Sequence, residues 1–140
     1  MEYRASAVIE ADPERIWSVL TDAPSWADWD SGVVRVEGRI APGEKIKLFP
    51  ELNPERGFPL RVVEFDPPRR MTFKGGMPLG LFKGLRNYTL EPAGDGGTRF
   101  EMRETLSGPL LPLIGRSLPD FGPSFEQFAR GLKARAEAGA

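Results

Sequence analysis

The chain has 140 residues, of which 40% are hydrophobic and 28% charged, and its formal net charge is −1. These values are typical of a globular protein, and a balanced charge without any basic run excludes a dedicated nucleic-acid surface. The chain contains neither cysteine nor histidine, which excludes disulfides, thiolate chemistry, Ser–His and Cys–His catalysis and ordinary zinc sites.

The amino-terminal residues predict a strand rather than a targeting segment. Side chains alternate over residues 3–10, so that Tyr3, Ala5, Ala7 and Ile9 share one face. There is no apolar core of a signal peptide and no apolar run long enough to span a membrane. We therefore expect a cytoplasmic protein that folds as one domain over residues 1–140, without metal or cofactor.

Two short helices are predicted after this strand. Asp12 is a favourable N-cap and Pro13 fits the first position of a helix. Residues 25–29 then form a second helical turn, on which Trp26 and Trp29 share a face because they are three residues apart. We expect these tryptophans to belong mainly to the core.

The period of the hydrophobic pattern changes to two from Val33 onward, which predicts six more strands. They cover residues 33–37, 45–49, 60–65, 71–74, 82–90 and 98–106. The last two flank the glycine-rich stretch 93–97, which favours a hairpin. Strands joined in sequence by short turns pair antiparallel, so the pattern indicates one seven-stranded antiparallel sheet.

A long helix is predicted over residues 123–137. Its apolar stripe consists of Phe125, Phe128, Ala129, Leu132 and Ala136. Because the rest of the chain is mostly sheet, we expect an α+β fold in which the sheet curves around this helix. Space left between them would form a binding cavity. Gly131 in the middle of the helix indicates either the close approach of a strand or a bend.

The last hairpin permits a prediction of its register. If the turn centres on Asp95, residues that face each other have numbers that sum to about 190. The opposed pairs are then Leu90 with Phe100, Tyr88 with Met102, and Arg86 with Glu104. All six side chains share one face, and two apolar pairs identify that face as the inner one.

The Arg86–Glu104 pair is the main candidate for a functional site. Beneath a helix, it could orient a ligand's carbonyl, hydroxyl or carboxylate group, which is the role we favour. It could also be a purely structural ion pair, or both side chains could reach solvent if the register slips.

Five short motifs occur in a characteristic order along the chain: Ala11–Trp17, Trp26–Trp29, Val62–Arg69, Gly97–Phe100 and Ser107–Leu110. With the long terminal helix, they resemble the START-like superfamily (also called Bet v 1-like or helix-grip), and within it the polyketide cyclase/dehydrase and lipid-transport type. The resemblance implies a seven-stranded antiparallel sheet that grips the C-terminal helix around a hydrophobic pocket. The Rieske ligands of the superfamily's ring hydroxylases are missing.

Three functions are compatible with this resemblance. The first is binding or transport of a small hydrophobic ligand that is a lipid, a polyketide-like molecule or an aromatic one. The second is a cyclase or dehydratase, in which Arg86 polarises a carbonyl while Glu104 and Tyr88 shuttle a proton. The third is a protein-interaction module with a filled core. The expected ligand contacts are Trp29, Phe73, Phe82, Arg86, Tyr88, Met102, Glu104, Leu111, Phe121, Phe125 and Phe128.

Two connecting segments, 75–82 and 108–115, are unusually apolar for loops. They could form a mobile rim around the pocket, contact a second copy in a homodimer, or touch a membrane surface. Ordinary packing at the base of the helix is the simplest interpretation for 108–115. For 75–82, packing and a rim role are equally supported.

Overall fold

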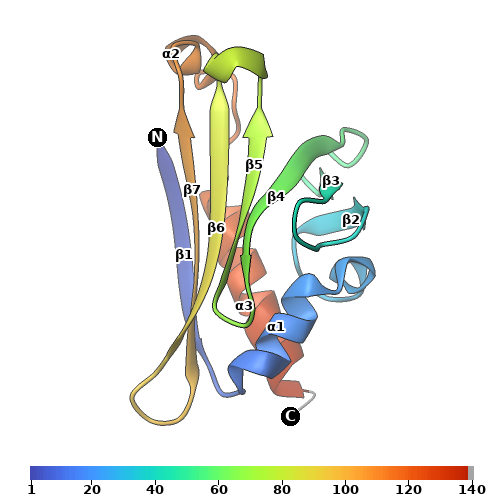
Figure 1. Cartoon of the computed structure of the whole chain (residues 1–140), viewed down its shortest axis with the longest axis vertical. Helices are drawn as coiled ribbons and strands as arrows, with labels where there is room; N and C mark the ends of the chain where they lie inside the picture. The colour runs from blue at the N-terminus through green and yellow to red at the C-terminus, as the bar shows by residue number, and fades with distance from the viewer. Residues whose placement is uncertain (139–140) are drawn as a thin grey trace.

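Seven antiparallel strands form one curved sheet in the order β1-β7-β6-β5-β4-β3-β2, and the C-terminal helix lies against its inner face (Figure 1). The computed structural model describes residues 1–138. The strands are β1 (Glu2–Ile9), β2 (Val33–Glu37), β3 (Lys45–Pro50), β4 (Phe58–Asp66), β5 (Arg70–Gly76), β6 (Lys83–Pro92) and β7 (Thr98–Ser107). The predicted sheet is confirmed.

The helical segments are α1 (Pro13–Thr21), η1 (Ala23–Asp28), η2 (Pro78–Gly80), α2 (Leu111–Ile114) and α3 (Gly122–Ala138). Two short helices follow the first strand, as predicted, and the second of them is a 3-10 helix. Within the described residues, no helix is both long and apolar enough to cross a membrane.

Helix α3 closes the inner face of the sheet and confirms the predicted α+β helix-grip fold. The apolar stripe expected from the sequence is buried along its whole length. The helix packs mainly on β1 and on α1, so the first strand and the last helix of the chain lie together. Burying this stripe provides the main hydrophobic stabilisation of α3.

The predicted register of the β6–β7 hairpin is also confirmed. Leu90 faces Phe100, Tyr88 faces Met102, and Arg86 faces Glu104. Neighbouring strands extend this last pair into a row across the inner face, with Phe73 beside Arg86 and Tyr3 beside Glu104.

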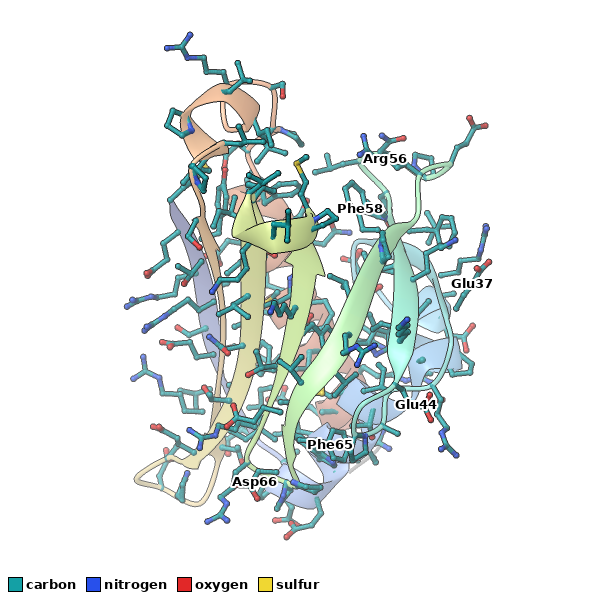
Figure 2. All side chains as sticks on the ribbon, turned by 45° about the horizontal axis from the view of Figure 1, so that its top comes forward. Glu37, Glu44, Arg56, Phe58, Phe65 and Asp66 are labelled. Atoms are coloured by element: carbon teal, nitrogen blue, oxygen red, sulfur yellow. The ribbon has the colours of Figure 1, made fainter. Side chains whose placement is uncertain are left out.

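The two ends of the sheet differ. We call the end that carries η2 and α2 the upper end, as it stands in Figure 1. Strand β4 runs from Phe58 at this end to Phe65 and Asp66 at the lower end (Figure 2). At the lower end, Phe65 packs on Trp17 of α1 with ring centroids 5.3 Å apart.

The middle of the inner face is filled by aromatic rings. Phe128 of α3 contacts Trp26, Tyr88 and Phe100 at centroid distances of 5.0, 5.7 and 6.1 Å. Phe73 lies 5.2 Å from Tyr88. Helix and sheet therefore meet directly here, and the sequence-based expectation of a cavity cannot apply to this part of the interface.

Gly131 marks a close approach to α3, but the neighbour is not a strand. A Cβ atom at this position would overlap the carbonyl oxygen of Asp30, in the turn between η1 and β2. The expectation that a strand approaches the helix was therefore wrong about the element. The glycine lets the backbone of the η1–β2 turn lie against the helix.

Candidate functional site

Arg86 and Glu104 form an ion pair on the inner face of β6 and β7. The Nη2 atom of Arg86 lies 3.2 Å from Oε2 of Glu104. Their side chains are only 16% and 12% exposed. Because two largely buried charges must compensate each other, the pair is a fixed feature of the interior rather than a solvated surface contact.

Helix α3 covers this ion pair with an aromatic ring. The guanidinium carbon of Arg86 lies 5.0 Å from the ring centroid of Phe125, within cation–π range. Tyr3 of β1 supports that ring from the other side, at 6.0 Å from Phe125 and 5.6 Å from Phe121. The first turn of α3 is thus held directly over the charged pair.

The electrostatics of the site keep Arg86 charged and Tyr88 neutral. Burial alone would lower the pKa of Arg86, but the Glu104 carboxylate and Tyr88 more than offset this and raise it. Burial raises the pKa of Tyr88, and the nearby Arg86 cation reduces that effect only in part. The Tyr88 hydroxyl therefore keeps its proton and remains a hydrogen-bond donor at neutral pH.

Three buried polar atoms in the interior lack a well-formed hydrogen bond within residues 1–138. They are Nε of Arg86, the hydroxyl of Tyr88, and Nε1 of Trp29. Arg86 and Tyr88 lie close enough to interact with each other, because a side-chain hydrogen bond between them contributes to the pKa shifts of both. A buried donor without a partner costs about 1–3 kcal/mol, and native proteins contain few of them.

Two glycines lie beside the ion pair. Gly75 of β5 and Gly84 of β6 are directly paired, two residues above the row that contains Arg86. A Cβ atom on Gly84 would lie 3.3 Å from the Leu106 side chain and 3.6 Å from Oε1 of Glu104, and one on Gly75 would lie 2.7 Å from the Leu60 side chain. The glycines therefore let neighbouring side chains pack closely against the backbone here.

Most of the residues predicted to contact a ligand are neighbours in the structure. Phe73, Arg86, Tyr88, Met102 and Glu104 occupy adjacent inner-face positions. From the helical side, Phe125 lies over Arg86, while Phe128 contacts Tyr88 and, at 5.1 Å, Trp29.

The other predicted contacts lie farther out. Phe121 is half-buried against Tyr3. Phe82, in the β5–β6 connection, and Leu111, the first residue of α2, lie at the upper end and are both half-buried. Sequence reasoning missed Tyr3, which faces Glu104 across β1 and β7. Its inward position was predictable from the alternation of residues 3–10, but its partner strand was not.

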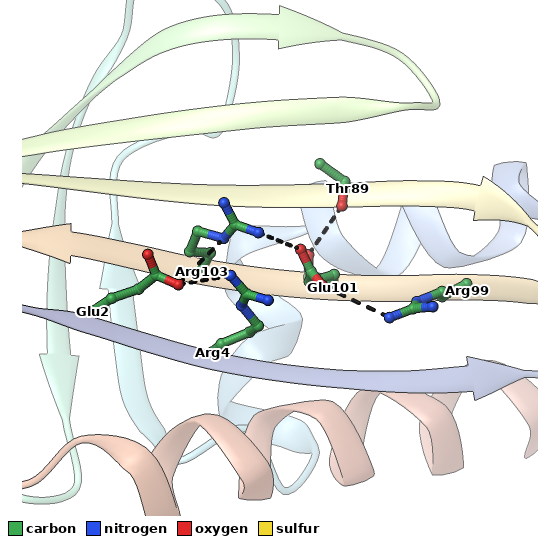
Figure 3. A network of polar contacts seen from close by, with 6 residues as sticks. All are labelled: Glu2, Arg4, Thr89, Arg99, Glu101 and Arg103. Carbon is green, nitrogen blue, oxygen red and sulfur yellow. Dashed lines mark hydrogen bonds and ion pairs between the residues drawn. The ribbon is translucent and has the colours of Figure 1, made fainter.

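A depression of about 260 Å³ lies on the outer face of the sheet, opposite the predicted site. It is lined by Thr89, Glu91, Arg99 and Glu101. Figure 3 shows the polar network around it, in which Glu101 pairs with Arg103 at 3.4 Å and with Arg99 at 3.9 Å. Such exposed ion pairs contribute little to stability.

The arrangement offers no metal site within residues 1–138, because no three metal-ligating side chains converge there.

The two apolar connections lie side by side at the upper end. The backbone nitrogen of Leu110 donates a hydrogen bond of 2.9 Å to the carbonyl oxygen of Leu81.

The protein has a helix-grip fold: a curved antiparallel sheet, a long C-terminal helix that packs on it, and short helices after the first strand. Residues 1–137 match the family described as polyketide cyclase / dehydrase and lipid transport. The chain therefore belongs to this family of START-like proteins. Among curated protein sequences, no relative matches it significantly.

Solved structures agree on the fold. A hypothetical protein from Helicobacter pylori superposes with a TM-score of 0.78 at 14% identity, over 97% of this chain and 88% of the other. A START superfamily protein from Mycobacterium smegmatis gives 0.70 at 16% identity, over 99% of both chains. The di-domain ARO/CYC protein StfQ of the steffimycin biosynthetic pathway gives 0.71 at 17% identity, over 99% of this chain and 52% of StfQ.

Proposed function

We propose that this protein binds a small hydrophobic molecule (a lipid, a polyketide-like compound or an aromatic one) between the sheet and the first turn of α3. The observation that carries this proposal is a pair of polar groups buried side by side on the inner face, Nε of Arg86 and the Tyr88 hydroxyl, neither of which makes a well-formed hydrogen bond. A ligand oxygen that accepts hydrogen bonds from these groups would recover the cost of burying them.

The charges of the site favour a neutral ligand oxygen. Glu104 already neutralises Arg86, so a ligand carboxylate would add an uncompensated charge to a largely buried site. A ketone or hydroxyl oxygen adds none.

Native mass spectrometry of protein purified from its own host tests the proposal. We expect a co-purified apolar molecule, and we expect compounds of the same class to raise the melting temperature of the emptied protein. The proposal fails if no molecule is retained and no member of a panel of lipids and aromatic polyketides raises the melting temperature. A protein with a filled core, acting through protein contacts alone, would give that result.

Tyr88→Phe makes the test specific to the site. Because the hydroxyl makes no well-formed hydrogen bond and only a weak contact with Arg86, its removal should change the free energy of unfolding by no more than about 1 kcal/mol. Ligand affinity should nevertheless fall about tenfold, which corresponds to one lost hydrogen bond. Thr89→Val, on the adjacent outer-face position, is the matched control and should bind normally. Unchanged affinity in Tyr88→Phe would exclude this donor.

A cyclase or dehydratase activity is the second candidate, favoured by the family's description and by the carboxylate beside Arg86. Arg86 would polarise a ketone and stabilise the enolate oxygen, while Glu104 removes the proton from the adjacent carbon. Glu104→Gln should then abolish turnover of a poly-ketone substrate while ligand-induced stabilisation persists. Turnover that survives this substitution would exclude the mechanism.

A further inference from the structure

Apolar side chains are exposed together at the upper end of the molecule. Met77, Leu79 and Leu81 of the β5–β6 connection are 44%, 96% and 37% exposed, and Leu113 of α2 is 70% exposed. We call these four residues the apolar tip. They lie close together because the Leu110–Leu81 hydrogen bond joins the two segments, which are adjacent at the top of Figure 1. Grouped exposed apolar side chains usually mark an interaction surface.

Leu79 is unfavourable for the protein alone in two respects. Its backbone has a φ of 61°, in the left-handed region where glycine and asparagine are favoured and leucine is not. Its side chain is also almost fully exposed, so no packing compensates for this conformation. A residue whose unfavourable backbone and exposed side chain are not compensated by contacts within the fold indicates an interaction with another molecule.

Four unpaired cations lie on the strands and the segment next to the apolar tip. Lys83 faces Gly76 at the start of the β5–β6 connection, and Lys74 lies directly opposite Arg61 on the outer face. Arg116 follows α2. None of these four cations forms an ion pair with another residue of the described chain, whereas the arginines near β1 and β7 are paired (Figure 3). Like charges opposite each other in a sheet are destabilising, so this pair also indicates an external anionic partner.

We propose that the apolar tip inserts into an anionic lipid bilayer while Lys74, Lys83, Arg61 and Arg116 contact its headgroups. A bilayer supplies both required environments in the correct order: an anionic plane at the level of the cations and an apolar medium beyond it. A flat acidic protein surface would satisfy the cations but would leave a protruding leucine without an apolar partner. This inference does not depend on what the inner face binds.

Vesicle flotation tests the proposal with the intact protein. Vesicles of phosphatidylcholine alone are compared with vesicles in which a quarter of the lipid is phosphatidylglycerol. We expect at least tenfold tighter binding to the anionic vesicles, and we expect this preference to decrease as salt is added. Equal binding to both, or binding to neither, overturns the proposal.

Leu79→Asn separates docking from folding. Asparagine tolerates the left-handed backbone better than leucine, so the melting temperature should stay the same or rise. Binding to anionic vesicles should fall at least tenfold because the most exposed apolar side chain is lost. The matched control is Val8→Thr, which removes a 48% exposed apolar side chain from the lower end of β1 and should bind normally.

Charge reversal tests whether the cations contact the lipid headgroups. Lys74→Glu combined with Lys83→Glu should abolish the preference for anionic vesicles, while Arg99→Glu, opposite Val8 at the lower end, should retain it. Undiminished vesicle binding in Leu79→Asn, or a preference for anionic vesicles that survives the double reversal, overturns the proposal. So does a dimer of the original protein that Leu79→Asn converts to monomer, since the apolar tip would then be covered by a second copy.

Discussion

Tyr88 lies at the centre of the inner face, with its ring packed among Phe73, Phe100 and Phe128. Phenylalanine would fill the same space without a hydroxyl to desolvate. The hydroxyl is buried beside the charged guanidinium of Arg86 and makes no well-formed hydrogen bond. On physical grounds, this one oxygen atom reduces the stability of the empty protein, and the proposed ligand contact would account for its presence.

The raised pKa of Tyr88 makes stability sensitive to alkaline pH. The phenol normally titrates at 10.0, and burial raises its pKa in the folded state. Above pH 10, the tyrosine of the unfolded chain therefore loses the proton that Tyr88 keeps in the folded protein. Stability contributed by this group is complete below pH 10 and is lost as pH rises through the folded pKa. Tyr88→Phe should remove this part of the alkaline loss, measured by urea unfolding across that range. If the original protein and Tyr88→Phe lose the same free energy of unfolding at alkaline pH, the prediction is contradicted.

Sequence reasoning reached the Arg86–Glu104 pair because a hairpin with a clear turn has a simple register. The partners of this pair from other elements could not be predicted in the same way. Phe125 approaches from α3 and Tyr3 from β1, and neither distance depends on a local period. The missing hydrogen-bond partners were also not predictable, since they depend on the complete three-dimensional arrangement.

At the scale of elements, α3 is held at its middle and near its end in addition to its first turn. Gly131 lets the backbone of the η1–β2 turn lie against the middle of the helix. Near its end, the Glu137 carboxylate accepts hydrogen bonds from the backbone nitrogen of Glu10 at 2.8 Å and from Nζ of Lys133 at 2.7 Å. Lys133 also donates to the carbonyl oxygen of Val8 at 2.8 Å. These contacts join the helix to the end of β1.

Gly131→Ala should destabilise the protein although alanine is the better helix former. The intrinsic gain is about 1 kcal/mol, but the new methyl group would overlap the Asp30 carbonyl oxygen, which is backbone and cannot rotate away. We expect a net loss of about 2–3 kcal/mol, seen as a lower melting temperature. Gly94→Ala, where a Cβ atom meets nothing within 4 Å, is the control. A Gly131→Ala protein as stable as this control would contradict the close approach.

Most elements were predicted, but the two shortest helices, η2 and α2, were missed because they are too short to show a period. The 17 residues of α3 repeat an apolar stripe over several turns, so the period is evident from the sequence. Helices η2 and α2 have only three and four residues. The sequence did show that both segments are apolar, but not that a hydrogen bond joins them at one end of the sheet.

Over the whole molecule, the four methionines divide between the interior and the upper end. Met71 and Met102 are 0% and 2% exposed, whereas Met1 and Met77 are 53% and 44% exposed. Met1 lies at the upper end because its carbonyl oxygen accepts a hydrogen bond from the backbone nitrogen of Leu106. Interior and surface methionines therefore report on different parts of the fold.

Mild peroxide treatment should oxidise Met1 and Met77 and leave Met71 and Met102 intact, because sulfoxide formation follows exposure. Peptide mapping by mass spectrometry measures each site separately. If the apolar tip enters a bilayer, anionic vesicles should slow the oxidation of Met77 without changing that of the interior pair. Early oxidation of Met102 would show that the inner face is more open than described.

The three tryptophans of the chain have an experimental consequence of their own. All lie in one corner: Trp17 in α1, Trp26 in η1 and Trp29 directly after it. Trp26 and Trp29 each contact Phe128 of α3, at 5.0 and 5.1 Å. Intrinsic fluorescence therefore reports how α3 is seated on this corner and gives no direct signal from the upper end. A spectral change on adding vesicles would therefore mean that the helix itself has moved, whereas a ligand could also change the signal by touching Trp29 directly.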